Sequence, residues 1–555
     1  MGIERMKKKW IDLTEFGLVL GVIACLNILL SKHFFRIDLT EDKRYSVAPV
    51  TKKMLENLTE KVYVEVYLDG QMEPDYDRLK KAIAEKLQEF AVYADKGLEY
   101  RFVDPNSIED KRLRENYFSQ LVQKGIQYRY YLHEEGGKKE EKIIFPGAIV
   151  AYKGREVPVM FVKGKKVASQ QEELNQAVEG VEFELISGLR KLSSVDVPVI
   201  AFVEGHGEWP KEEVADITKD LSDYYYVNRI NLNDSADLGI FATLIIAAPE
   251  QPFTEKEKLK LDQYVMRGGS LLMLIDPLNV YKDSLVNGVT YALPYQLNLD
   301  DLLFRYGVRV NPTLVQDKYS GVTRVRTTNE QSQVLSYPFY PVVYNFGKHP
   351  IVRNLDAVLT RFVSTIDTVK AERVTKIPLL YTSGNTKVTG APIQIDLNSL
   401  RKESVPESFQ SGRQNIGYLL EGEFTSLYKN KPLPFPTGDF KDQSSPSRII
   451  VIADGDLIRN EYDPVRKQSL ALGYDLNMRY QFSNKDLLIN AIDYLAGQEI
   501  VNVRGKEIKL RPLDKEKVIH ERYAMQIVNI VLPLILLILF GLARFYFRKR
   551  KYTRF

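Results

Sequence analysis

Cysteine is almost absent from this chain: the single cysteine in 555 residues is Cys25, inside an apolar run near the N-terminus. The rest of the chain therefore has no thiol for a disulfide, a thiolate nucleophile or a redox Cys-x-x-Cys pair. A chain of this length buries a large core without such cross-links. No cluster of histidines and acids has metal-ligand spacing, so we expect neither a metal nor another cofactor.

Two catalytic signatures are also missing. No Gly-x-Ser-x-Gly elbow presents a nucleophile after a strand. No Gly-x-x-x-x-Gly-Lys-Ser/Thr loop is present, so the chain does not bind ATP through a P-loop. The sequence therefore predicts a protein that is not an enzyme.

Long apolar runs lie at both ends of the chain. The runs 16–30 and 527–543 are nearly free of polar residues. The residues beside them are ones that a membrane helix tolerates, and they extend the runs to 11–35 and 523–547. A membrane helix needs about 20 such residues. We predict one transmembrane helix at each end, with Asn27 and Asn529 as candidate contacts to other helices inside the membrane. The alternative is a pair of buried core helices.

The flanking charges predict an orientation. The first ten residues carry +3 and the last twelve +6, so the formal net charge of +4 leaves −5 for everything between them. Short basic flanks remain cytoplasmic. We expect a bacterial inner-membrane protein with both termini in the cytoplasm and its middle in the periplasm. The excess of basic residues lies in the flanks of the two spans, so the positive net charge does not indicate binding of nucleic acid.

The residues after the first span have the pattern of a small α/β domain. Strand and helix patterns alternate from Lys61 to Gly125, and two strands joined at Lys153–Arg155 follow. This order resembles the thioredoxin fold, with Pro146 before the third strand of that fold. A charged helical linker, 166–196, comes next.

A larger α/β domain is expected from 197 to 498. Continuous apolar strands alternate with amphipathic helices, which indicates a parallel sheet covered on both faces. Thr254 and Glu257 form a capping-box pattern at one helix start. The segment of about 320–445 reads as an irregular, strand-poor insertion. The expected boundaries are 1–10 basic tail, 11–35 span, 36–165 thioredoxin-like domain, 166–196 linker, 197–498 second domain, 499–522 connector, 523–547 span and 548–555 basic tail.

Acidic residues, glycines and a histidine follow several predicted strands of the second domain. In open parallel sheets, ligands bind beyond the carboxyl ends of the strands. These residues therefore form a candidate ligand or partner site. The alternative is ordinary turn and capping chemistry. The candidates are Glu204, His206, Asp276, Asp454 and Asp456.

Three segments in order resemble the GldG family, the gliding-motility-associated auxiliary subunits of ABC transporters. They are FRIDLTEDKRYSVAPVTKKML after the first span, EGHGEW with FTEKEKLKLDQYVMRGGSLLMLIDP, and ADGDLIRN with NKDLLINAIDYLAG before the last span. The resemblance implies a permease partner, GldF, an ATPase partner, GldA, and a glutamine-amidotransferase-like second domain. It carries no catalytic residue, since that fold's cysteine is absent here.

Three functions follow, in order of preference. The first is a non-enzymatic auxiliary subunit that docks on a permease through its spans and presents an extracytoplasmic domain to an envelope protein or a solute. The second is a solute-binding receptor of the transporter. The third is an extracytoplasmic hydrolase or amidotransferase, which the missing nucleophile disfavours.

Overall fold

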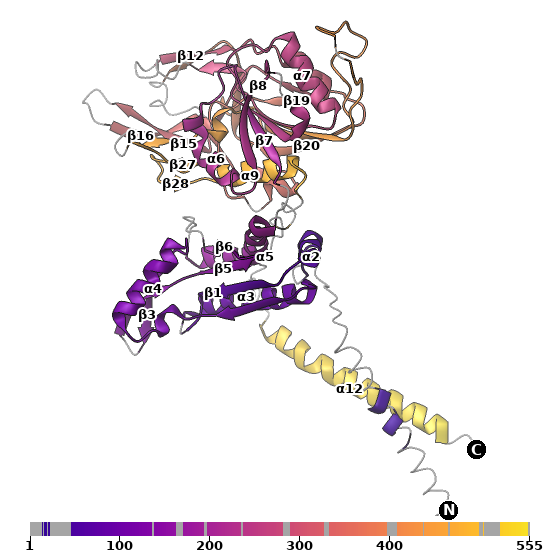
Figure 1. Cartoon of the computed structure of the whole chain (residues 1–555). Helices are drawn as coiled ribbons and strands as arrows, with labels where there is room; N and C mark the ends of the chain where they lie inside the picture. The colour runs from indigo at the N-terminus through magenta and orange to yellow at the C-terminus, as the bar shows by residue number, and fades with distance from the viewer. Residues whose placement is uncertain are drawn as a thin grey trace, which may run out of the picture. The chain divides into compact units, whose positions relative to one another are not determined.

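The computed structural model forms two compact units, Met1–Glu507 and Ile508–Phe555 (Figure 1). It describes residues 14, 16–18, 20–22, 46–70, 72–135, 138–162, 170–193, 197–234, 237–280, 289–326, 332–353, 355–396, 408–436, 438–463, 467–498, 503 and 522–552. The protein is a mixed α/β protein, as the sequence predicted.

The first part of the larger unit is built on a four-stranded sheet in the order β2-β1-β5-β6. Strand β1 pairs in parallel with β2 and antiparallel with β5, which pairs antiparallel with β6. The strands are β1 (Val62–Val66), β2 (Leu98–Phe102), β5 (Gly147–Tyr152) and β6 (Arg155–Met160). The helices are α2 (Pro49–Glu56), α3 (Pro74–Tyr93), α4 (Lys111–Gln123) and α5 (Gln170–Ser193). Pro146 directly precedes β5.

Strand alternation places apolar side chains on both faces of this sheet. Val62 and Val64 of β1 join a core with α2, α3 and α5. On the opposite face Tyr67 and Ile149 pack with Leu121 of α4. A hairpin of β3 (Arg129–Glu135) and β4 (Lys138–Ile144) was not expected from the sequence, because its charged residues lack the apolar alternation of a buried strand.

The second part contains an eight-stranded sheet in the order β17-β20-β23-β24-β10-β9-β7-β8. The strands β8, β7, β9, β10 and β24 run parallel to one another. Antiparallel strands β23, β20 and β17 extend the sheet beyond β24. The parallel strands are β7 (Val199–Glu204), β8 (Tyr226–Asn231), β9 (Phe241–Ala247), β10 (Ser270–Leu274) and β24 (Ser447–Ile452).

Helices cover both faces of this sheet, as its continuous apolar strands require. Helices α7 (Glu255–Met266) and α8 (Asp300–Tyr306) share one core with Leu244 and Met273. Helices α6 (Ala215–Leu221) and α9 (Asn484–Leu495) share the other with Ile245 and Leu272. Neighbouring residues along β9 and β10 therefore point to opposite faces of the sheet and enter different cores.

The segment expected to be an irregular insertion is instead rich in short strands. Two of them, β20 (Val374–Tyr381) and β23 (Asn415–Gly422), extend the main sheet. Within the segment, β15 (Ser320–Arg326) pairs with β16 (Ser332–Val343). Two other strands of the segment pair with strands that precede it: β21 (Thr386–Gly390) with β14 (Thr313–Asp317), and β22 (Ile393–Asp396) with β12 (Val289–Pro294). Prolines and polar residues interrupt the apolar alternation here, for example Pro378 inside β20, and this hid the strands.

Helix α5 is held near its middle by a buried charge cluster. The Glu182 carboxylate accepts hydrogen bonds from Ala48 N (2.7 Å) and Thr51 Oγ1 (3.0 Å) at the start of α2. The Nζ atom of Lys86 on α3 lies 3.5 Å from Glu182 Oε2 and 2.9 Å from Glu89 Oε2. The segment that precedes α2 is thereby fixed to both longer helices.

A second buried ion pair joins the end of α5 to α9. Arg190 Nη1 lies 3.1 Å from Asp493 Oδ1, and Arg190 Nη2 donates to Tyr225 Oη at 3.2 Å. The Tyr225 hydroxyl also donates to Asp493. Both charged side chains are only 7% exposed, so each depends on the other for compensation.

The C-terminal unit contains helix α12 (Arg522–Tyr552). Its segment Asn529–Arg550 is long and apolar enough to cross a membrane, and its side chains are exposed. Among the described residues this is the one such helix. Most of the predicted first span, including Asn27, lies outside the described residues, although Phe16–Leu18 and Leu20–Val22 are helical.

The two basic residues at the end of α5 provide a matched test of the buried pair. Arg190→Gln leaves Asp493 buried without its partner charge, which typically costs about 3–5 kcal/mol. Lys191→Gln removes a more exposed pair with Asp223, which is typically worth about 0–1 kcal/mol. Urea unfolding of the full chain in detergent measures both. Equal destabilisation by the two variants would contradict the role assigned to Arg190.

Candidate functional site

The carboxyl ends of the parallel strands define the candidate site. The strand order reverses at β7. The next strand of the chain, β8, lies on one side of β7 at the edge of the sheet, and β9 lies on the other side of β7. Ligands of open α/β sheets bind beside such a reversal of strand order, outside the carboxyl ends of the strands. Four of the five predicted site residues follow strands at this edge, and the fifth, Glu204, is the last residue of β7.

A cavity of about 240 Å³ opens at this edge. One part of its lining is apolar or aromatic and consists of Trp209, Ala248, Pro249, Leu278, Val280, Tyr295 and Phe362. The other part is polar and consists of Glu250, Asp276, Asn279, Asp456 and Arg459. Two of the predicted site residues, Asp276 and Asp456, therefore contribute to one cavity.

The loop after β24 is packed tightly against the end of β10. Gly455 N donates to Asp276 Oδ1 at 2.8 Å. A Cβ atom on Gly455 would lie 2.5 Å from the Ala248 Cβ, so a side chain does not fit there. Trp209 Nε1 donates to Gly455 O at 2.8 Å, which fixes the indole at the cavity wall. The glycine thus permits the close approach of three strand ends.

Two residues of the lining have a left-handed backbone without being glycine. Ala248 has φ of 55° and Phe362 has φ of 51°. This conformation costs about 1–2 kcal/mol for a residue with a Cβ. Such strain persists only where the surrounding structure imposes it, and it concentrates at functional sites. We therefore treat the cavity as the best candidate site among the described residues.

Asp454 lies beside the cavity loop but does not line the cavity. Its side chain is fully buried: Oδ2 accepts a hydrogen bond from Arg361 N at 2.8 Å, and Oδ1 has no partner among the described residues. Burial raises the pKa of Asp454 well above its usual value, and the charges of Asp276 and Asp456 add to this. Burial and the neighbouring carboxylates therefore favour the neutral acid form of Asp454.

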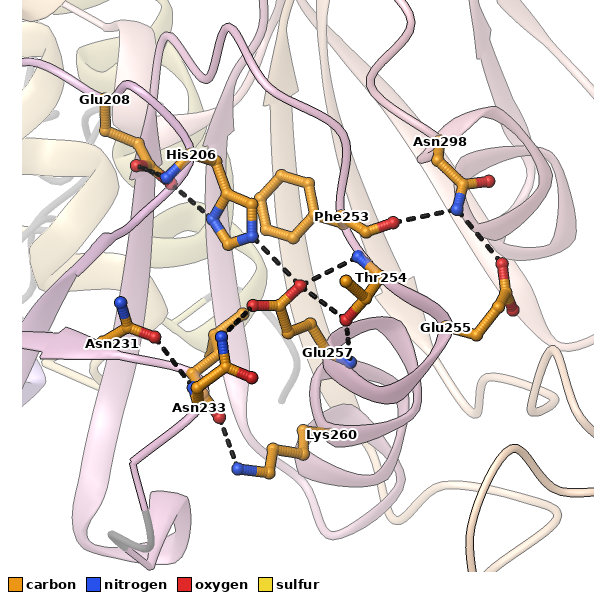
Figure 2. Close-up of polar contacts among 11 residues, drawn as sticks. His206, Glu208, Asn231, Asn233, Phe253, Thr254, Glu255, Glu257, Lys260 and Asn298 are labelled. Atoms are coloured by element: carbon orange, nitrogen blue, oxygen red, sulfur yellow. Dashed lines mark hydrogen bonds and ion pairs between the residues drawn. The ribbon is translucent and has the colours of Figure 1, made fainter.

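His206 faces a buried network rather than the cavity (Figure 2). Its Nδ1 lies 3.2 Å from Glu208 Oε1 and its Nε2 lies 3.2 Å from Glu257 Oε2, and its ring stacks on Phe253 at 3.7 Å. Glu257 also completes the predicted capping box with Thr254 at the start of α7. Both ring nitrogens thus contact carboxylates that anchor the loop after β7.

The network shifts the pKa values of its members in opposite directions. Burial alone would lower the pKa of His206, but the hydrogen bonds and charges of Glu208 and Glu257 outweigh it and raise the pKa. Burial would raise the pKa of Glu257, but hydrogen bonds from Thr254 and His206 lower it. The imidazolium form is thus favoured between the two carboxylates.

Glu204, the remaining predicted residue, lies outside the cavity lining. Its carboxylate accepts a hydrogen bond from Arg229 on the neighbouring strand β8, and its side chain is 45% exposed. The described residues contain no group of three or more His, Cys, Asp or Glu residues arranged to hold a metal ion.

Several residues that line the cavity were not among the site residues predicted from the sequence. Trp209, Glu250 and Arg459 follow predicted strands within a few residues, so their positions carried a usable signal. Phe362 comes from the segment expected to be irregular and Tyr295 from the stretch before it, and no local pattern connects either residue to this edge.

The fold, the strand-end cavity and the apolar helix α12 define a mixed α/β protein with a candidate membrane-spanning segment. The chain belongs to the family described as ABC-type uncharacterized transport system, whose model matches residues 197–491. A second model, domain of unknown function DUF7088, matches residues 41–151. The protein is therefore an auxiliary component of the ABC transport class.

Two further comparisons give one relative and one solved structure, both with low sequence identity to this chain. The chain is 23% identical over 566 residues to an uncharacterized protein of Borreliella burgdorferi, covering 98% of this chain and 100% of the relative. A solved structure, "mmIFT52 N-terminal domain", matches with a TM-score of 0.31 and 14% identity, over 54% of this chain and 97% of its own.

The charged state of His206 predicts a pH-dependent contribution to stability. Because folding raises the pKa of His206, its stabilisation is complete below the unfolded value of about 6.5 and is lost as the pH rises through the folded value. His206→Gln should therefore destabilise the chain more at pH 6 than at pH 9, by about 1–3 kcal/mol at the lower pH. Thermal unfolding of both proteins across this range measures the difference, and a difference independent of pH would refute the assignment.

Asp454 predicts the same fall in stability with rising pH, but its substitution has the opposite effect, because the ionised group is a cost rather than a benefit. Because folding raises its pKa, the acid costs stability increasingly as the pH rises from about 4, where the unfolded carboxyl ionises, to the folded value. Asp454→Asn keeps an oxygen for Arg361 N and removes this cost. The variant should match the wild-type melting temperature near pH 4 and exceed it at pH 8. A lower melting temperature at pH 8 would show that the ionised carboxylate is required.

Proposed function

We propose that this chain is a non-enzymatic auxiliary subunit of an ABC transport system that docks on the permease through two membrane spans. The observation that carries the proposal is the family match over residues 197–491 on a chain that also has the exposed apolar helix α12. ATP hydrolysis belongs to a partner, since the sequence has no P-loop.

The proposed location is the bacterial inner membrane, with both termini in the cytoplasm and the middle of the chain in the periplasm. Arg548, Lys549 and Arg550 at the end of α12, and the basic residues before the first apolar run, support this orientation. The spans are 11–35 and 523–547, and the periplasmic domains are 36–165 and 197–498, joined by 166–196.

The two periplasmic domains are proposed to be thioredoxin-like and glutamine-amidotransferase-like. The strand order β2-β1-β5-β6, with one parallel pair, supports the first assignment. Five parallel strands between covering helices support the second. Neither region contains a cysteine, which supports a binding role over catalysis.

The likeness to GldG supports a narrower proposal, in which the partners are a GldF-like permease and a GldA-like ATPase and the system serves gliding motility. The family match supports the transport part of this proposal. The three ordered sequence segments support the gliding part.

A second candidate function is a solute-binding receptor of the transporter. The specific observation in its favour is the cavity at the strand ends, with its aromatic and acidic lining. A receptor and a docking subunit are compatible roles, since the cavity and the spans are different parts of the chain.

Asn529 tests docking separately from anchoring. Asn529→Leu keeps α12 apolar and removes a side-chain hydrogen bond typically worth about 1 kcal/mol between membrane helices. We expect the variant to stay in the membrane fraction but to co-purify less ABC permease and ATPase, quantified by mass spectrometry. Ile530→Leu is the matched control and should leave recovery unchanged.

Deleting either span provides the stronger form of the same test. Loss of one span should abolish co-purification of the permease while the other span retains the chain in the membrane. Undiminished recovery of the permease after either deletion would overturn the docking proposal.

A further inference from the structure

We infer that the cavity at the carboxyl edge of the main sheet binds an alkylammonium group, either of a small free amine or of a lysine side chain. The inference deepens the receptor function and does not depend on docking through the spans. It rests on the charge, the aromatic lining and the size of the cavity.

Carboxylates reach the cavity from three different strand ends. Glu250 follows β9, Asp276 follows β10 and Asp456 follows β24. Among the described lining residues, Arg459 is the cation. Its guanidinium is paired with Glu213, which lies outside the lining, and its Nη1 also lies 3.9 Å from Asp456 Oδ1 within it. The lining thus holds three carboxylates and one guanidinium. The lining is therefore net negative, which selects a cationic ligand.

The cavity also presents aromatic side chains. Trp209, Tyr295 and Phe362 contribute to the lining. Aromatic rings attract ammonium groups through the negative charge of their faces. The guanidinium of Arg459 lies 4.3 Å from the centre of the Trp209 ring, so the protein itself places one cation against this indole. Carboxylates and rings together favour an ammonium over a metal ion, which needs a denser set of oxygen ligands.

The volume limits the size of the ligand. At about 240 Å³ the cavity is smaller than the roughly 300–1,000 Å³ of sites for drug-sized molecules. It suits a short diamine or the end of one lysine side chain. It does not suit a folded peptide or a polysaccharide segment.

The tryptophan content of the chain provides a direct reporter. The sequence has two tryptophans, Trp10 in the N-terminal flank and Trp209 in the cavity. In the full chain with Trp10→Phe, purified in detergent, Trp209 is the sole source of tryptophan fluorescence. Titration uses putrescine for the free amine and Nα-acetyl-lysine amide for the side chain, with butane-1,4-diol as the uncharged match to putrescine.

We expect a saturable fluorescence change, confirmed by calorimetry, with one or both amines and none with the diol. The double variant Asp276→Asn/Asp456→Asn should weaken the affinity by about tenfold or more, because each change removes a charged hydrogen-bond acceptor. Asp439→Asn, at a carboxylate that is 77% exposed and outside the lining, should bind as the parent does.

Absence of saturable binding of both amines by fluorescence and by calorimetry would overturn the inference. Equal binding of the diol, or unchanged affinity in a double variant whose circular dichroism and melting temperature match the parent, would do the same. Because these measurements need no partner protein, their failure leaves the docking proposal standing, and loss of docking leaves this inference standing.

Discussion

The buried charges on helix α5 join elements of the larger unit that lie far apart in the sequence. Glu182 ties the helix to the segment before α2, and Arg190 ties it to Asp493 of α9. Buried charges are tolerated only when they are compensated, so each pair exists only while its elements are in place. Through α5, the four-stranded sheet and the eight-stranded sheet belong to one structure, although separate family models match their regions.

Elements with strong local patterns could be predicted from the sequence. The apolar strands β7, β9, β10 and β24 were recognisable because they are buried on both faces, and Thr254 with Glu257 marked the start of α7. The strands of 320–445 were not recognised, because most of them pair in short antiparallel sheets that tolerate polar residues and proline. Their formation depends on partners distant in the sequence, such as Gly417 opposite Ile452.

The candidate site could be predicted only as an edge of the sheet. Residues that follow parallel strands necessarily meet at one edge, so Asp276 and Asp456 could be expected together. Which side chains enter the cavity depends on the loops. His206 turns to Glu208 and Glu257, and Glu204 turns to Arg229. These choices follow from hydrogen-bond partners that the sequence does not place in space.

The loop between β24 and α9 forms one wall of the cavity, and residues that do not line the cavity hold this wall in place. Arg459 pairs with Glu213, and Asn460 N donates to Glu213 O at 2.7 Å. Farther along the same connection, Leu472 N donates to Asp216 of α6 at 2.7 Å. A wall fixed in this way keeps Asp456 in position without a ligand. Binding then requires little ordering of the protein, and even a small ligand retains most of the free energy of its contacts.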